Sequence, residues 1–223
     1  MERYDVLVIG GGHAGCEAAL ASARIARTAL LTENLDMIAF LRETKHLVEE
    51  ISCPLMDALR RSSAAMPFLL DRILGEADRD PAPSLDPLVY HRKMKHLLER
   101  TQNLDLFQIK VDSVIDRLKN TEGVRTAFGK KFSAEAVILC TGSPEYGSEL
   151  SVRYKKEAQS VDVKKDQMSR NTKDLFFAGE LISDMTPVLA AAYGINAGIY
   201  ASNHVLHPRA SFIKELIDSS LMI

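Results

Sequence analysis

The sequence predicts an α/β fold with a mostly parallel sheet, and three observations lead to this fold class. A short apolar strand at residues 4–9 runs into a glycine-rich turn and then into an alanine-rich helix. A second apolar strand, at 28–31, follows that helix directly. Two later apolar strands, at 136–140 and 175–178, are each followed closely by a glycine. Short buried strands that alternate with helices are typical of parallel sheets covered by helices.

The turn after the first strand has the glycine spacing of a dinucleotide-binding loop. Gly10, Gly12 and Gly15 fit G-x-G-x-x-G. Gly10 permits the sharp turn, Gly12 leaves room for a pyrophosphate, and Gly15 lets the helix pack closely on the sheet. We expect the helix to open near Ala14, so that its unpaired N–H groups and its positive dipole end point at the phosphates. His13 lies within the same predicted phosphate site.

The end of the second strand supplies a candidate ribose-binding acid. Glu33 lies 18 residues after Gly15 (33 − 15), close to the offset of about 20 residues in dinucleotide sites. Thr32 and Asn34 flank this acid and belong to the same predicted site. The alternative interpretation is a structural glycine turn followed by an acid that is merely solvated.

Composition narrows the class of protein and its partners. The chain has 28 basic and 30 acidic residues and a net charge of −2, so nucleic-acid binding by this chain alone is not expected. Three scattered cysteines and six histidines lack metal-site spacing, which predicts neither a disulfide framework nor a metal. The first strand leaves no room for a signal peptide, and no apolar run reaches about 18 residues. We therefore expect no membrane segment and a cytoplasmic protein.

The middle of the chain is expected to leave the sheet and return to it. A helical excursion covers about residues 37–101, and a β-meander covers about 112–133 with Gly123 and Gly129 as turn residues. Within these regions we expect helical periodicity at 37–59 and 62–74, a proline-rich loop at 79–87, an amphipathic helix at 88–100, and strands at 106–111, 113–118, 124–128 and 131–132.

The last third is less regular. Short strands are expected at 150–154 and 160–163, in a segment (143–174) without an assigned task. C-terminal helices are expected over about 184–221: a long one to about residue 206, with Pro187 in its first turn, and a short one at 210–221. We expect one domain over residues 1–223.

The order of segments resembles the FAD domain of glutathione-reductase-type flavoproteins, a Rossmann-like three-layer fold. In that family, strand ends of the A-T-G and A-G-D kinds flank the cofactor. Here they are Cys140-Thr141-Gly142 and Ala178-Gly179-Glu180, with glutamate in place of the commoner aspartate. The resemblance implies that Thr141, Gly142, Gly179 and Glu180 lie beside FAD.

The same resemblance implies a role in flavin binding for the helix that follows residue 185. A helix N-terminus near flavin N1 and O2 stabilises the negative charge of the reduced ring. By resemblance, Thr186, Pro187, Val188 and Leu189 lie against the isoalloxazine. An ordinary core helix is the alternative.

Longer motifs resemble the glucose-inhibited division protein A family over roughly residues 1–145 and 172–206. Members of that family bind FAD and, with a GTPase partner, install a carboxymethylaminomethyl-type group on the wobble uridine of tRNA; a folate-dependent tRNA methyltransferase is a close relative. The resemblance also implies that the backbone of Val111 meets the adenine. The motifs are GGGHAGCEAAL, TEN-D-I at 32–38, KHLVEEI, YHRKMKHLLERTQNLDLFQIKV, VILCTG and LFFAGE.

Departures from the family restrict what is implied. The family's cysteine- and glycine-rich signature is replaced by residues 39–42, and only about thirty residues separate Gly142 from Leu175, where the family has an inserted domain. Cys53 lies near the signature's position without its glycines, so both a catalytic thiol and a buried thiol stay open. No catalytic residue is assigned.

Three functions stay open at this point. The first is an FAD-dependent oxidoreductase of unknown substrate, reduced by NADH or by a protein electron donor, because no second G-x-G-x-x-G is present. The second is a noncatalytic FAD-binding module, or an accessory protein in tRNA modification, that structures a complex. The third is a plain NAD-binding protein. A homo-oligomer or a protein partner is open in each case.

Overall fold

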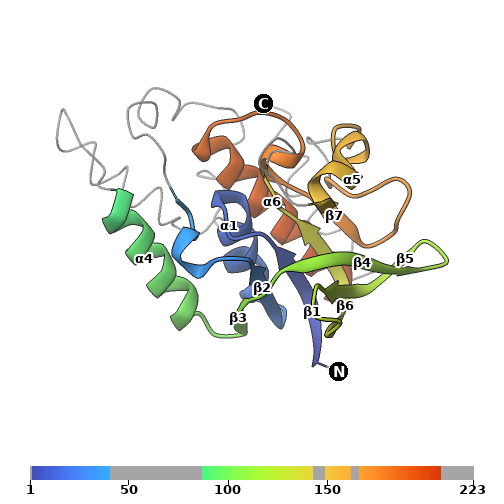
Figure 1. The fold of residues 1–223 in the computed structure, drawn as a ribbon, viewed down its shortest axis with the longest axis horizontal. Coiled ribbons are helices and arrows are strands. Elements are labelled where there is room, and N and C mark those ends of the chain that lie inside the picture. Colours follow the sequence, from blue (N-terminus) through green and yellow to red (C-terminus); the bar gives the residue numbers. More distant parts are fainter. Residues whose placement is uncertain (1, 41–86, 143–148, 162–165, 207–223) are drawn as a thin grey trace.

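A seven-stranded sheet organises the part of the chain that the computed structural model describes, which is residues 2–40, 87–142, 149–161 and 166–206. The strands are β1 (Glu2–Ile9), β2 (Thr28–Thr32), β3 (Leu104–Gln108), β4 (Val111–Arg117), β5 (Asn120–Thr126), β6 (Lys131–Leu139) and β7 (Leu175–Phe177). Their order is β3-β2-β1-β6-β5-β4, and β7 also pairs with β6 (Figure 1).

The long strand β6 joins two kinds of sheet. It runs parallel to β1 over nearly its whole length, with Glu2 opposite Phe132 and Ile9 opposite Leu139. On its other edge, its first residues pair antiparallel with β5 and its last residues pair parallel with β7. The parallel strands β3, β2, β1, β6 and β7 therefore form the predicted α/β sheet, and β4 and β5 extend it as the predicted meander.

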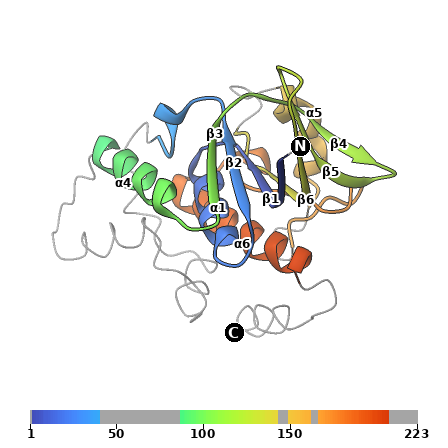
Figure 2. The same cartoon turned by 90° about the horizontal axis from the view of Figure 1, so that it is seen from below.

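Three helices cover one face of the parallel strands. They are α1 (His13–Ala23), α4 (Pro87–Arg100) and α6 (Pro187–Leu206). Their buried side chains pack with Val6, Val8 and Ile138, which alternate along the strands with residues of the other face. In α4 the buried stripe is Tyr90, Met94 and Leu98, spaced at four residues. Figure 2 shows α1 and α6 side by side below the sheet.

Helices α1 and α6 approach closely because their contact is built from small residues. A Cβ atom at Gly194 would overlap the backbone of Ala14, and one at Gly198 would lie 2.5 Å from the carbonyl oxygen of Ala18. The alanine-rich sequences of both helices leave no larger side chain between them. This packing fixes the start of α1 relative to the sheet.

The opposite face is covered by the meander and by α5 (Glu149–Ala158). Val124 of β5, Phe132 at the start of β6 and Leu150 of α5 are buried in one cluster with Leu7 and Val137 of the parallel strands. The three layers confirm the predicted Rossmann-like α/β class. None of the helices within the described ranges is both long and apolar enough to cross a membrane.

Several predicted elements are wrong in detail. The strand expected at 150–154 is part of the helix α5, whose inward side chains Leu150, Tyr154 and Ala158 are spaced at four residues. The strands expected at 131–132 and 136–140 are one strand, β6. The strand expected at 106–111 is interrupted after Gln108. A 3₁₀ turn, η1 (Leu35–Met37), stands where the first helical excursion was expected to begin.

The turn residues of the meander also differ from the prediction. Gly129 lies in the β5–β6 turn with a φ of 80°, as expected, but Gly123 lies inside β5 with a φ of 132° beside a register shift. Leu118 and Lys119 form the β4–β5 turn instead, with φ values of 52° and 65°. The predictions at 37–59, 62–74, 79–87, 160–163 and 210–221, and Cys53, lie wholly or partly outside the described residues.

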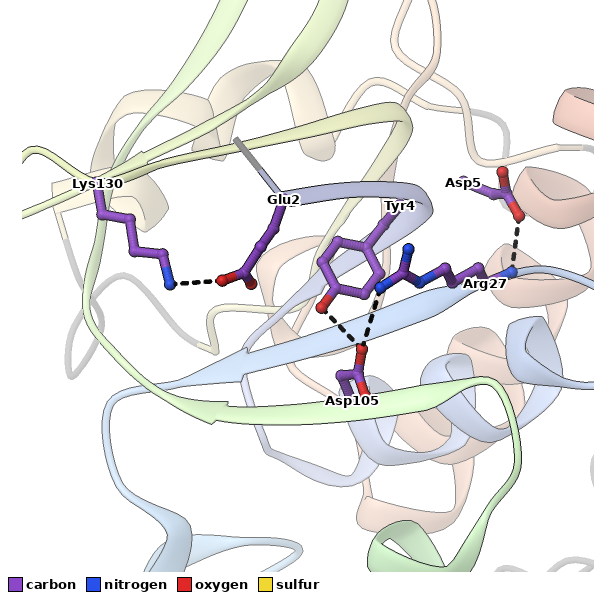
Figure 3. A network of polar contacts seen from close by, with 6 residues as sticks. All are labelled: Glu2, Tyr4, Asp5, Arg27, Asp105 and Lys130. Atoms are coloured by element: carbon purple, nitrogen blue, oxygen red, sulfur yellow. Dashed lines mark hydrogen bonds and ion pairs between the residues drawn. The ribbon is translucent and has the colours of Figure 1, made fainter.

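Polar side chains tie the amino ends of the strands together (Figure 3). Tyr4 donates a hydrogen bond of 2.8 Å to Asp105, and the Arg27 guanidinium lies 3.8 Å from the same carboxylate. Lys130 pairs with Glu2 at 3.0 Å. These contacts leave the carboxyl ends of the strands, where parallel sheets bind ligands, free of this network.

Candidate cofactor-binding site

A groove of about 470 Å³ lies at the carboxyl ends of β1, β2 and β6. This volume is within the range of about 300–1,000 Å³ that is typical of small-molecule sites, and the position is the one at which open α/β sheets bind ligands. The groove is lined by Ile9, Gly10, Gly11, Gly12, Leu31, Thr32, Glu33, Asn34, Met37, Ile109, Lys110, Val111, Cys140, Thr141, Gly142 and Leu150.

The glycine turn is closely packed on its inner side and open on the groove side. Gly10 has a φ of 109°, and a Cβ atom there would overlap the carbonyl group of Cys140. A Cβ atom at Gly15 would overlap the carbonyl group of Gly10, and one at Gly11 would lie 2.8 Å from Thr32 Oγ1. At Gly12 nothing lies within 4 Å of that position. The turn therefore has the geometry that the sequence predicts.

The N-terminus of α1 carries no competing side chain. Gly12 is its N-cap, no side chain caps the helix, and the first turn contains no acid. The unpaired N–H groups of this turn are therefore not neutralised by the protein's own side chains. Helix α1 begins at His13, within one residue of the predicted position.

His13 does not add a cation to this end of the helix. Its ring stacks on Tyr90 of α4, with centroids 5.7 Å apart, and its Nδ1 lies 3.3 Å from the Tyr90 hydroxyl. Burial lowers the pKa of His13 to about 4, against a smaller opposing effect of a hydrogen bond with the backbone of Phe40. The imidazole is therefore neutral at pH 7. An anion at this end of the helix would be bound by backbone N–H groups.

Glu33, the predicted ribose-binding acid, follows β2 directly and lines the groove. Its carboxylate is about half exposed, with Oε1 3.9 Å from Nζ of Lys110. The neighbouring Asn34 uses its side chain locally, because Asn34 Oδ1 accepts a 2.8 Å hydrogen bond from the backbone N–H of Asp36. Asn34 thus shapes the wall of the groove while its side chain caps η1.

The Thr141-Gly142 turn forms the opposite wall and rests on α5. Ser151 is fully buried, and its Oγ lies 3.0 Å from the carbonyl oxygen of Thr141 and 2.9 Å from Thr141 Oγ1. Leu150 lines the groove beside this turn. The segment without an assigned task therefore contributes part of the site.

The second glycine-terminated strand reaches the same end of the sheet. Gly179 begins the 3₁₀ turn η2 (Gly179–Leu181) with a φ of 71°, and a Cβ atom there would lie 2.7 Å from Cβ of Ala14. Glu180 follows, with Oε2 3.9 Å from the position of a Cβ atom on Gly142. The two strand ends and the start of α1 are thus brought together, as the sequence predicts.

Helix α6 begins at Pro187, whereas the C-terminal helices were expected to start at about residue 184. Thr186 precedes it, and its Oγ1 accepts a 3.4 Å hydrogen bond from the backbone N–H of Leu189. Pro187 and Leu189 lie in the first turn of α6, next along the chain from η2, and neither is among the described residues that line the groove.

Two buried thiols and one buried acid lie near the site. Cys16 and Cys140 are free and buried, and burial raises the pKa of both thiols. Burial also raises the pKa of Glu17 to about 8, and its Oε1 has no hydrogen-bond partner within the described part of the chain. These thiols are protonated at pH 7, which excludes them as exposed redox thiolates. No cluster of metal-ligating side chains occurs among the described residues.

The groove gathers half of the predicted site residues: Gly10, Gly12, Thr32, Glu33, Asn34, Val111, Thr141 and Gly142. His13, Ala14, Gly15, Gly179, Glu180, Pro187 and Leu189 are not among the described residues that line it. Sequence reasoning missed Gly11, Lys110 and Leu150. Lys110 stands next to Val111 and so had a local signal, whereas Leu150 lies in a segment whose residues favour a strand locally.

Comparison with known proteins identifies the family. The model of the family described as glucose inhibited division protein A matches residues 5–160. The tRNA uridine 5-carboxymethylaminomethyl modification enzyme MnmG of Protochlamydia amoebophila is 39% identical over 152 residues, which are 63% of this chain and 24% of that protein. The chain thus spans about a quarter of the length of this relative.

Solved structures agree. GidA of Aquifex aeolicus matches 63% of this chain and 25% of its own, with 29% identity and a TM-score of 0.52. The GidA-related protein of Thermus thermophilus matches 92% of this chain and 99% of its own, with 20% identity and a TM-score of 0.61, a likeness of fold. On the match over residues 5–160, this chain belongs to the glucose-inhibited division protein A family.

Proposed function

We propose that this chain is a flavoprotein that binds FAD, with the ADP half of the cofactor in the groove. The observation that carries this proposal is the asymmetry of the glycine turn. Its inner side is filled at Gly10 and Gly15, whereas Gly12 faces open space. A turn that serves only to reverse the chain has no need of an empty space beside an uncapped helix N-terminus.

The order of the lining residues fits the parts of the cofactor. The backbone of Gly11 and Gly12 and the first turn of α1 would hold the pyrophosphate. Glu33, at the end of β2, would accept hydrogen bonds from the ribose hydroxyls. The backbone of Val111, which is nearly buried, would meet the adenine edge. These contacts account for the pyrophosphate, ribose and adenine of the ADP half.

The flavin half would extend past Gly142 and Glu180 toward the start of α6. Thr141 and Gly142 would hold the middle of the cofactor, and Gly179 and Glu180 would contact the ribityl–phosphate region. Thr186, Pro187, Val188 and Leu189 would then lie against the isoalloxazine. Bound flavin supplies the hydride and electron chemistry, while the protein positions it and tunes its potential. The N-terminus of α6 would favour the reduced, negatively charged ring.

We infer an FAD-dependent oxidoreductase that takes electrons directly from NADH or from a protein donor. Neither described thiol is placed for electron transfer, because Cys16 and Cys140 are buried with raised pKa values. Two free cysteines also suit a reducing cytoplasm, where we propose that the protein works. Its substrate would be defined by whatever reaches the isoalloxazine.

A second candidate is a noncatalytic FAD-binding module or an accessory protein in tRNA modification. Residues 39–42 favour it, because the cysteine- and glycine-rich signature of the family is replaced there by Ala-Phe-Leu-Arg. In this case the flavin would stabilise the protein and its partner surface without turning over.

The experiment that separates these candidates starts from protein stripped of bound small molecules and titrated with FAD, ADP and NAD⁺. The proposal predicts saturation at one FAD per chain, with ADP as a competitor and NAD⁺ much weaker. Anaerobic mixing of the FAD-loaded protein with NADH then follows the flavin absorbance. Reduction by NADH and rapid reoxidation by an acceptor support the oxidoreductase. A bound flavin that is reduced by light, but is neither reduced by NADH nor reoxidised by an acceptor, supports the noncatalytic module. Absence of FAD binding contradicts both.

A further inference from the structure

Lys110 stands beside Glu33 in the wall of the groove. Its Nζ lies 3.9 Å from Glu33 Oε1, and both side chains are about half exposed. Among the described residues that line the groove, these two are the ones that carry a formal charge. The candidate ribose acid therefore has a cation as its neighbour.

The backbone on both sides of Lys110 is fixed. The N–H of Ile109 donates a 2.7 Å hydrogen bond to the carbonyl oxygen of Thr32, so the ends of β3 and β2 are joined next to Glu33. The carbonyl oxygen of Lys110 accepts a 3.0 Å hydrogen bond from the N–H of Ala127, and Val111 begins β4 in a nearly buried position. Lys110 thus lies at a hydrogen-bonded junction between the parallel sheet and the meander.

The negative charge of Glu33 is unfavourable in this groove once an anion is bound there. A pyrophosphate carries negative charge and would repel the Glu33 carboxylate from the groove. The residue nearest to the phosphate-binding turn, His13, is neutral at pH 7 because burial lowers its pKa to about 4. A cation that holds the carboxylate in place has to come from elsewhere in the wall.

We propose that Lys110 is a positioning residue that holds the Glu33 carboxylate toward the ribose of the bound cofactor. This inference rests on the proposed function, because it needs FAD in the groove. Lys110 acts through Glu33, so its contribution to FAD affinity disappears when the carboxylate is absent. It is no part of the phosphate site and makes no contact with the reacting ring.

The chain offers a matched control in Lys130. Its ion pair with Glu2, at 3.0 Å, is also about half exposed, but it lies at the amino ends of the strands, away from the groove (Figure 3). Exposed ion pairs of this kind contribute little to stability. Lys110→Met should therefore leave thermal unfolding of the FAD-free protein unchanged. Lys130→Met also removes a cation–π contact, because Lys130 Nζ lies 4.6 Å from the centroid of the Phe132 ring. Only Lys110→Met should alter FAD binding.

The test is a set of FAD titrations on the full chain. We expect Lys110→Met to weaken FAD about threefold at low salt, and the difference from wild type to shrink in 0.5 M NaCl, since salt screens an exposed pair. Lys110→Arg should restore the affinity and Lys130→Met should leave it unchanged. In a Glu33→Gln background, Lys110→Met should have no further effect.

Two results would overturn the inference while the proposed function stands. One is wild-type FAD affinity in Lys110→Met. The other is an equal loss in both backgrounds, which would mean that Lys110 contacts the ligand itself. If the wild-type chain binds no FAD, the proposed function fails and this inference fails with it. These outcomes are distinct, because the wild-type titration is read first.

Discussion

Gly15 packs directly on the carbonyl group of Gly10, so that the first turn of α1 closes on the turn that precedes it. The contact leaves no room for a methyl group, because the Gly10 carbonyl belongs to the backbone and cannot rotate away. Three residues earlier in the sequence than Gly15, Gly12 faces empty space. Two glycines of one motif thus serve different purposes, and substitutions can separate them.

Gly12→Val should keep the fold and lose the cofactor. The backbone at Gly12 is extended, with φ −71° and ψ −177°, so a branched residue is tolerated there. Its side chain would fill the space that the pyrophosphate needs. Circular dichroism should be that of the wild type, and FAD titration should show no saturation. Full FAD occupancy in this variant would remove the assignment of the turn.

Gly15→Ala should instead destabilise the whole protein. Overlap with the Gly10 carbonyl forces α1 away from the sheet, at a cost of about 3 kcal/mol. Urea unfolding of FAD-free protein measures this loss, and Gly12→Val is the control of similar position. Equal stabilities of the two variants would be incompatible with the packing described here.

Glu33→Ala should weaken FAD about tenfold without unfolding the domain, through loss of a charged acceptor for the ribose hydroxyls. Glu135→Ala is the matched control. Glu135 is also about half exposed and pairs with a cation, Arg3, at 2.8 Å, but it is remote from the groove. Calorimetric titration compares the two. An FAD affinity that is the same in both variants would mean that Glu33 is only solvated.

Glu17→Gln should flatten the dependence of stability on pH. Burial raises the pKa of Glu17 from 4.5 to about 8 in the folded protein. The folded state therefore keeps a proton that the unfolded chain releases, so this contribution is full below pH 4.5 and is lost as the pH rises to about 8. The loss is on the order of 5 kcal/mol.

Comparison of the wild type with Glu17→Gln isolates the contribution of Glu17 to the pH dependence of stability. His13, with its pKa lowered to about 4 by burial, destabilises the fold as the pH falls, but it is present in both. Urea unfolding between pH 5 and 8 should show the variant gaining stability over the wild type as the pH rises. A constant difference across this range would show that Glu17 ionises normally.

Gly194→Ala should damage folding and FAD binding together. An added methyl group would overlap the backbone of Ala14, in the first turn of α1, where the pyrophosphate is proposed to bind. We expect a loss of roughly 3 kcal/mol, together with weaker FAD binding in the fraction that folds. Gly129→Ala, at a turn with a φ of 80° and no neighbour within 4 Å, should cost about 1 kcal/mol and leave FAD affinity unchanged.

The parts of this fold that the sequence predicts are those fixed by local sterics. The turn at Gly10 needs a left-handed backbone, and β1 alternates between two buried faces, so both can be recognised from a few residues. The same holds for the ends of β6 and β7, where glycines 142 and 179 also adopt positive φ. The groove follows from these elements because parallel strands place their carboxyl ends together.

The parts that were missed depend on tertiary contacts. The segment 150–154 contains valine and tyrosine and favours a strand locally, but burial of Leu150 and Ala158 against the sheet makes it a helix. Leu118 and Lys119 are poor turn residues, and the pairing of β4 with β5 imposes positive φ on them. Lys110 and Glu33 are far apart in sequence, so no local sequence pattern predicts their ion pair.

The most direct test of the central claim is the identity of the small molecule that co-purifies with the protein, measured by absorbance and mass. The account predicts a yellow protein that releases FAD close to one per chain, and a colourless Gly12→Val variant that still folds. An adenine nucleotide without a flavin, or folded protein that takes up no FAD when it is supplied, would contradict it.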